Sequence, residues 1–231
     1  SLYDINNIID VGANFGYHAL LFSKEVKQNV FAFEPQLQNF QLLEKNIKDN
    51  NITNIIPYNL ACGDVNCDIQ MPIMNELDPN QIYKINMGDF TPNIVNNINE
   101  TTTTKSIVLD EMEFTSQIDL IKIDVQGWER KVLSGAYNLL STHKPILIVE
   151  FEWFQLKKTN TTCQELFDFI KKNNYHIFYL EYQYPSDHVC VHNDNLTEFR
   201  NKFNNYIFPH TVDNDLNNNI QYGVNEKIVV I

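Results

Sequence analysis

The stretch Ile8-Ile9-Asp10-Val11-Gly12-Ala13-Asn14-Phe15-Gly16-Tyr17 decides the fold of this chain. Its apolar run ends in an acid, a glycine turn follows, and an apolar helical pattern then continues to about residue 26. A second apolar run, at residues 29–34, closes on an acid of its own, Glu34. The order of strand, glycine turn, helix, strand and acid predicts the opening half of a nucleotide-binding Rossmann unit.

The spacing of glycines and acids in this unit favours one cofactor. A dinucleotide places its diphosphate against a dense G-x-G-x-x-G turn, where a carboxylate would repel it. Here Asp10 stands at the strand tip, and it suits the ammonium and sulfonium groups of S-adenosylmethionine. Glu34 can accept hydrogen bonds from both ribose hydroxyls. We therefore expect S-adenosylmethionine to bind here, at Asp10, Gly12, Ala13, Asn14, Gly16, Glu34 and Pro35.

The remaining pattern alternates between strand-like and helix-like segments, which is typical of an α/β fold. We expect strands at about 7–11, 29–34, 55–60, 118–124, 145–151, 175–182 and 187–192, and helices at about 35–50, 129–141 and 162–173. This order predicts a Rossmann-like, doubly wound, mostly parallel seven-stranded sheet with helices on both faces. Residues 1–192 would form the main domain, and residues 193–231 a C-terminal extension packed on it, with a further strand at 227–231.

One segment breaks the alternation. Residues 75–104 are rich in Asn, Thr and Pro and show little periodicity. A loop of that length inside a compact domain is usually functional or disordered. We expect it to cover the strand ends as a lid over the acceptor.

Two further strands end in acids. Residues 118–124 form a near-continuous apolar strand with Lys122 and Asp124 on one face, followed by a glycine turn. Glu150 ends the strand at 145–151. Ligands of open α/β sheets bind at the carboxyl ends of the strands, so these side chains would lie beside the cofactor. A structural ion pair is the alternative role for Lys122 and Asp124, and backbone hydrogen bonding is the alternative for Glu150.

The charge of the chain limits its partners. Its net charge is −12 and its pI about 4.8, which argues against a nucleic-acid backbone or an anionic membrane surface as partner. No apolar run is long enough to span a bilayer, and the four cysteines have no metal-binding spacing. We read the chain as cytoplasmic with reduced thiols. The sequence does not predict the oligomeric state.

By its ordered motifs the chain resembles the FkbM-type S-adenosylmethionine-dependent methyltransferases. The strings that carry the resemblance are Ile9–Gly16, Phe33-Glu34-Pro35 with Asn39 and Asn46, Ala61–Asp64, Val108–Glu111, Lys122–Gly127 with Glu129, Val132-Leu133 with Gly135, and Pro145 through Phe151. Together they cover roughly residues 5–192. The turn at Ala61 would border the adenine. Where the family string carries a glutamate, this chain has Gln126.

The resemblance implies methyl transfer from the sulfonium to a hydroxyl, typically of a sugar or a natural product. The hydroxyl has to lose its proton, and the candidate catalytic residues are Asp124, Glu150, His18 and Lys122. Alternatively, Mg²⁺ or Mn²⁺ held by Asp124 and Glu150 would acidify it. An O-methyltransferase for a sugar or glycan is our leading interpretation. A methyltransferase for a non-sugar metabolite and an inert cofactor-binding or interaction module are the alternatives.

Overall fold

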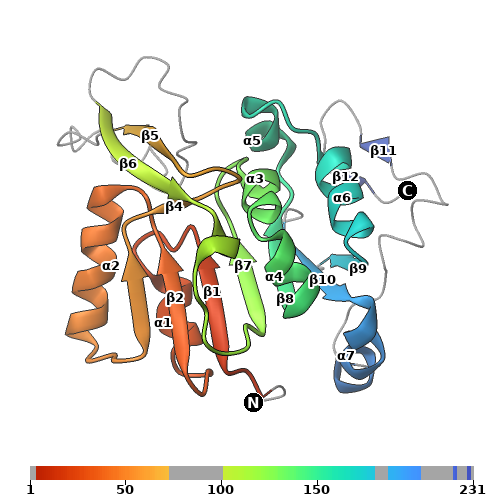
Figure 1. Cartoon of the computed structure of the whole chain (residues 1–231), viewed down its shortest axis with the longest axis horizontal. Coiled ribbons are helices and arrows are strands. Elements are labelled where there is room, and N and C mark those ends of the chain that lie inside the picture. Colours follow the sequence, from red (N-terminus) through yellow and green to blue (C-terminus); the bar gives the residue numbers. More distant parts are fainter. Residues whose placement is uncertain (1–3, 73–100, 180–186, 204–220, 223–227, 230–231) are drawn as a thin grey trace.

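The computed structural model describes residues 4–72, 101–179, 187–203, 221–222 and 228–229. Seven strands form the main sheet (Figure 1) in the order β3-β2-β1-β7-β8-β10-β9. Their bounds are β1 Asn7–Val11, β2 Asn29–Phe33, β3 Ile55–Tyr58, β7 Leu120–Ile123, β8 Ile146–Glu150, β9 Tyr175–Tyr179 and β10 Asp187–His192. β10 runs antiparallel to both of its neighbours, and the other ladders are parallel. The predicted seven-stranded, mostly parallel sheet is confirmed.

Helices cover both faces of this sheet, as predicted. Alternate residues of a strand point to opposite faces, so Ile9 and Val11 of β1 join one hydrophobic cluster and Ile8 joins another. The first cluster packs under α3 (Glu129–Ser134), α4 (Tyr137–Thr142) and α6 (Cys163–Lys172). The second packs under α1 (Tyr17–Phe22) and α2 (Leu37–Asp49). Figure 1 shows α3, α4 and α6 in front of the sheet and α1 behind it.

The sequence predicted one helix over 129–141, and this prediction is wrong. The helix is broken between α3 and α4 at Gly135, where an added Cβ would lie 1.9 Å from the carbonyl oxygen of Gly63. The Asp110 carboxylate then accepts hydrogen bonds from the amides of Asn138 (2.7 Å) and Leu139 (2.8 Å) and starts α4 afresh. Gly63 and Asp110, which cause the break, are distant in sequence from the helices, so helical periodicity alone could not reveal it.

A second, three-stranded sheet lies beside the first and was not predicted. It consists of β4 (Ala61–Cys62), β6 (Thr101–Ile107) and β5 (Cys67–Pro72), with β6 parallel to β4 and antiparallel to β5. The part of the expected lid at 101–104 is therefore strand. The rest of that expectation, up to residue 100, lies outside the described residues.

The helices that follow β8 contribute residues to the hydrophobic clusters of the main sheet. Helix α5 (Trp153–Lys158) follows β8, and α6 begins with a capping box formed by Thr162 and Glu165. Beyond β10, the short 3-10 turn Asn193–Asn195 leads into α7 (Leu196–Phe203). Phe199 of α7 packs with Phe178 of β9. Within the expected strand at 227–231, Ile228–Val229 (β12) pairs with Gln221–Tyr222 (β11) as a separate ribbon.

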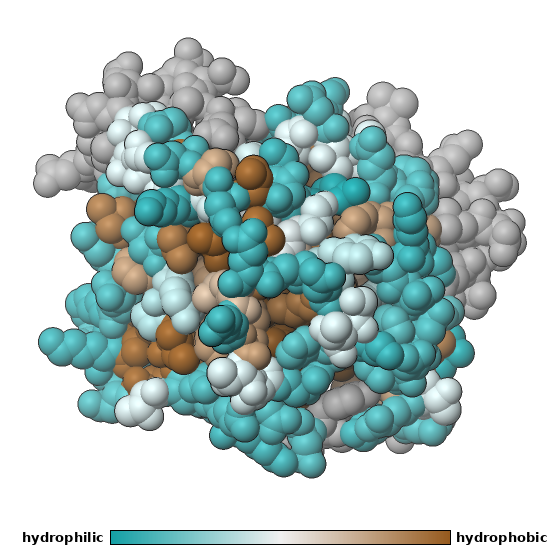
Figure 2. Space-filling model, viewed as in Figure 1, coloured by the Kyte–Doolittle hydropathy of each residue, from teal (hydrophilic) through white to brown (hydrophobic). Residues whose placement is uncertain are grey.

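The visible surface is mostly hydrophilic (Figure 2). Figure 2 shows that the face carrying α3 and α4 is largely hydrophilic, with apolar atoms gathered over β2 and β3. There the rings of Phe31 and Phe114 meet edge to face at 5.1 Å. Among the helices that the structure describes, none is long and apolar enough to cross a membrane.

Candidate active site

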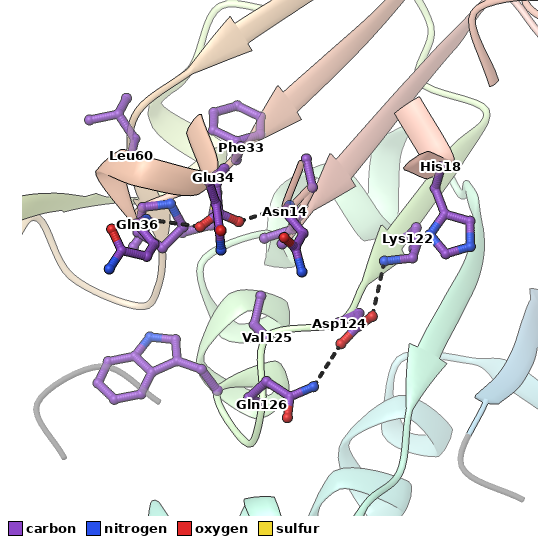
Figure 3. A pocket seen from close by; sticks show the side chains of 18 of the residues that line it. Asn14, His18, Phe33, Glu34, Gln36, Leu60, Lys122, Asp124, Val125 and Gln126 are labelled. Atoms are coloured by element: carbon purple, nitrogen blue, oxygen red, sulfur yellow. Dashed lines mark hydrogen bonds and ion pairs between the residues drawn. The ribbon is translucent and has the colours of Figure 1, made fainter. Parts of the chain in front are cut away.

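A cavity of about 380 Å³ opens at the carboxyl ends of β1, β2, β7 and β8, within the size range of small-molecule sites. Figure 3 shows residues from these strands and from α1 facing one another around it. The sequence-predicted site residues on its wall are Gly12, Ala13, Asn14, His18, Glu34, Pro35, Ala61, Lys122, Asp124 and Glu150. Two other predicted residues, Asp10 and Gly16, lie behind the wall.

The glycine turn after β1 is packed against the backbone. The amides of Gly12 and Ala13 both donate to the carbonyl of Phe33, each at 3.0 Å. Gly12 has φ +82°, and an added Cβ would lie 1.8 Å from the carbonyl oxygen of Asp124. Gly16 starts α1 with φ +94°, and a Cβ there would meet Leu43 at 2.5 Å. The turn therefore offers neither of its first two amides to a diphosphate.

Glu34 stands just after β2 with its carboxylate fixed by main-chain donors. Its Oε2 accepts from the amide of Asn14 (2.8 Å), and its Oε1 accepts from the amide of Gln36 (2.9 Å). Asn14 reaches this position with a left-handed backbone, φ +53°. Burial raises the pKa of Glu34 to about 7, although these bonds oppose the shift. The Asn39 side chain is a third donor to this carboxylate, whose two oxygens offer about four lone pairs, so at least one stays open to a ribose hydroxyl.

Next to Glu34 the wall becomes apolar. Phe33, Leu60, Ala61, Met71, Val125 and Trp128 line this part. Within the described residues, the buried indole Nε1 of Trp128 has no hydrogen-bond partner. The amide of Gly63 donates to the Ile107 carbonyl (2.9 Å) and is not available to a ligand. A flat, mostly apolar ring such as adenine fits between these side chains, next to the predicted Ala61.

Asp10, Lys122 and Asp124 form a chain of charges at the other end of the cavity. Asp10 and Lys122 are register partners on the α1 face of the sheet, with Nζ to Oδ1 at 3.6 Å, and Nζ also contacts Asp124 Oδ2 at 3.3 Å. Burial by itself lowers the pKa of Lys122, but the two carboxylates outweigh it and raise the pKa. Asp10 has no exposed surface. We expected Asp10 to contact the cofactor, and the structure corrects this expectation. The side chain is buried behind the cavity wall and acts on the cavity only through Lys122.

Gln126 connects Asp124 with Glu150. Its Nε2 donates to Asp124 Oδ1 (3.1 Å) and to Glu150 Oε2 (3.2 Å), as Figure 3 shows for Asp124. Burial, and then the negative charge of Asp124, raise the pKa of Glu150 to about 9, so this acid is protonated at neutral pH. In the described part of the chain, no three metal-ligating side chains come together. Gln126 Nε2 already occupies one oxygen of Asp124 and one of Glu150, and a cation would have to displace it, so the residues present do not fit the expected Mg²⁺ or Mn²⁺.

His18 lies in the first turn of α1, and Figure 3 shows its ring next to Lys122. Burial, followed by the positive charge of Lys122, lowers the pKa of His18. The imidazole is therefore neutral at pH 7 and able to accept a proton.

Sequence reasoning missed several wall residues. Gln36 caps α2 through its side chain, which accepts from the amide of Gln38 (3.1 Å), but glutamine is not one of the residues that mark an N-cap in a sequence. Trp128 and Met71 gave no signal, because they reach the cavity from the α3 side and from the unpredicted β5. Asp187, which is next to the site and not on the cavity wall, was also missed. It pairs in register with Glu150 across the antiparallel β8–β10 ladder, which sequence spacing does not show.

Comparison with known proteins gives consistent matches. Residues 10–177 match the model of the Methyltransferase FkbM domain. The hexuronic acid methyltransferase AglP of Haloferax volcanii is 29% identical over 142 residues, covering 60% of this chain and 53% of that protein. Methyltransferase 1 of Beauveria bassiana is 24% identical over 146 residues, covering 57% of this chain and 59% of that protein. The chain thus spans somewhat more than half the length of these relatives.

A solved structure shares the fold. The methyltransferase FkbM of Methylobacillus flagellatus KT superposes with a TM-score of 0.53 at 17% identity, covering 82% of this chain and 44% of that one. The predicted Rossmann-like, class I methyltransferase fold is confirmed.

Proposed function

The chain belongs to the FkbM methyltransferase family, and on that premise we propose that it transfers a methyl group from S-adenosylmethionine to a hydroxyl of a sugar or glycan. One observation carries the proposal. A single cavity joins a carboxylate suited to a ribose diol, Glu34, to a cluster of ionisable groups around Asp124. The hexuronic acid methyltransferase among its relatives supports a saccharide acceptor.

The cofactor end would bind by shape and by hydrogen bonding. Glu34 would accept the ribose hydroxyls while Asn14 and Gln36 hold its carboxylate in place. The apolar wall at Ala61 and Trp128 would enclose the adenine and exclude water from it. A charged hydrogen bond of this kind contributes about 1.5–3 kcal/mol.

At the other end the residues would have distinct roles. When bound, S-adenosylmethionine supplies a methyl group activated by the positive sulfonium. Asp124, held by Lys122, would place one negative charge near that cation. Glu150, protonated at neutral pH, would donate a hydrogen bond to the acceptor.

His18 is our candidate for the general base. As the acceptor oxygen forms its bond to the methyl carbon, the neutral imidazole would take the hydroxyl proton. Both oxygens of Asp124 already accept hydrogen bonds, from Lys122 and Gln126, which makes Asp124 the weaker base. Because the bond to the sulfonium breaks as the new one forms, holding the reacting atoms in line would supply much of the acceleration.

The test uses the purified chain with methyl-labelled S-adenosylmethionine and a cell extract separated into glycan, protein, lipid and small-metabolite fractions. We expect label in the glycan fraction, and little transfer by the isosteric variant Asp124→Asn. Alkali-stable label in a purified oligosaccharide would identify an ether at a hydroxyl, whereas alkali-labile label would identify an ester at a carboxylate. Label confined to another fraction would overturn the saccharide acceptor, and no transfer to any fraction would overturn the activity.

A further inference from the structure

Gln126 occupies an unusual position between two acids. It follows β7 with a left-handed backbone, φ +55°, which directs its side chain across the cavity mouth toward β8. Its Nε2 lies 3.1 Å from Asp124 Oδ1 and 3.2 Å from Glu150 Oε2. An amide nitrogen carries two hydrogens, so one Nε2 can donate to both neighbours at once.

We propose that the Gln126 amide bridges Asp124 and Glu150 in the place where a divalent cation would link two carboxyl groups, and that it thereby positions both acids for methyl transfer. A cation bound to the same two oxygens would have to displace Nε2. Gln126 is a positioning residue in this proposal, since it acts through Asp124 and Glu150. The proposal rests on the proposed function only in assigning this end of the cavity to the reaction.

The charges around the bridge agree with a neutral donor. Lys122 already balances Asp10 and contacts Asp124. With Glu150 protonated, the bridge joins one neutral acid to the carboxylate that Lys122 contacts. One negative charge can be held by an amide donor. Two ionised carboxylates at that spacing would call for a metal ion or a third donor.

The family string places a glutamate where this chain has Gln126, so the substitution Gln126→Glu is an informative test. It keeps the shape of the side chain but exchanges the donor for a third acid. The variant then offers three carboxyl groups at one mouth, and a hard cation favours that set. Gln126→Asn is the matched control, because asparagine tolerates a positive φ and adds no charge.

The first experiment measures Mn²⁺ binding by electron paramagnetic resonance on the purified proteins without cofactor or acceptor. We expect Gln126→Glu to bind one Mn²⁺ per chain about tenfold or more tightly than the wild type. Adding Asp124→Asn to that variant should abolish the gain, and Gln126→Asn alone should show none. Equal melting temperatures of the wild type and the four variants, within a few degrees, would show that each is folded. Stoichiometric Mn²⁺ binding by the wild type that is lost in Asp124→Asn would overturn the proposal.

The second experiment tests positioning by comparing S-adenosylhomocysteine binding with methyl transfer to the labelled glycan fraction. For Gln126→Asn we expect transfer to fall about tenfold or more while affinity for S-adenosylhomocysteine changes less than about threefold. An equal loss of both, or unchanged transfer, would overturn the positioning role. Absence of transfer by the wild type would reject the proposed function alone, since the Mn²⁺ result would still decide the bridge.

Discussion

The two ends of the cavity are held in place by different means. At the cofactor end, main-chain amides of Asn14 and Gln36 hold Glu34. At the reacting end, side chains hold side chains, because Lys122 and Gln126 together fix Asp124. A backbone N–H remains a donor after most substitutions of its residue, whereas a side-chain donor is lost when that side chain is replaced. We therefore expect binding to be robust at the first end, and the chemistry to be sensitive to single changes at the second.

The largest effect is expected where the two ends meet, at Gly12. The substitution Gly12→Ala would place a methyl group 1.8 Å from the carbonyl oxygen of Asp124, at a backbone with φ +82°. The backbone at residue 12 and the backbone at Asp124 would both have to move. We therefore expect a loss of about 4 kcal/mol or more in the free energy of unfolding. Denaturant melting measures this. Gly63→Ala is the control with a smaller expected loss, since its nearest contact is the rotatable Ser106 hydroxyl. An equally stable Gly12→Ala protein would contradict the packing described.

A somewhat smaller loss is expected from Lys122→Met at the reacting end. It would leave Asp10, which has no exposed surface, without its cation. Breaking a buried ion pair in this way costs about 3–5 kcal/mol. The double substitution Asp10→Leu with Lys122→Met should recover at least half of the loss, because an apolar pair leaves no buried charge. Additive losses in this double-mutant cycle would show that the two residues are not coupled.

The same contrast explains how much of the molecule could be predicted from sequence. Gly12, Asn14 and Glu34 lie in one strand-turn-helix-strand unit, so their local pattern places them without knowledge of the whole fold. The bridge from Gln126 to Glu150 depends on the pairing of β7 with β8, which local spacing does not contain.

The missed elements have the same physical cause. The break between α3 and α4 depends on the close approach of Gly63 to Gly135. Likewise, β5 and β6 pair although they are separated by residues 73–100. Burial removed Asp10 from the cavity wall, and no strand pattern tells which of several acids at strand ends stays accessible.

At the cofactor end, Glu34→Ala should weaken S-adenosylhomocysteine binding by about 1.5–3 kcal/mol, because the ribose hydroxyls lose a charged acceptor. Isothermal titration calorimetry measures the change. The control is Glu25→Ala, which removes an exposed acid beyond α1 and should leave the affinity unchanged. Equal affinities of wild type and Glu34→Ala would place the ribose elsewhere.

The pH dependence of binding sharpens that result. The pKa of Glu34 is raised to about 7, so the carboxylate that accepts hydroxyl donors is populated above that pH and lost as the pH falls below it. Affinity for S-adenosylhomocysteine should therefore drop as the pH falls from 8 to 6. At one pH unit below the pKa of Glu34, the affinity should be lower by up to about tenfold. In Glu34→Gln the dependence should flatten. A wild-type profile that rises toward pH 6 has the wrong sign for this assignment.

The smallest effect on binding is expected at His18. Its ring is partly exposed on α1 and faces Lys122, away from Glu34, so His18→Asn should change S-adenosylhomocysteine affinity less than about twofold. Methyl transfer should nevertheless fall by about 10²–10⁴, the usual contribution of a general base. Because the lowered pKa keeps the wild-type imidazole neutral at pH 7, transfer by the wild type should decline only as the pH falls through that pKa and the ring becomes protonated. A His18→Asn protein that loses binding and transfer together would make His18 part of the cofactor end. Unchanged transfer would return the role of base to Asp124.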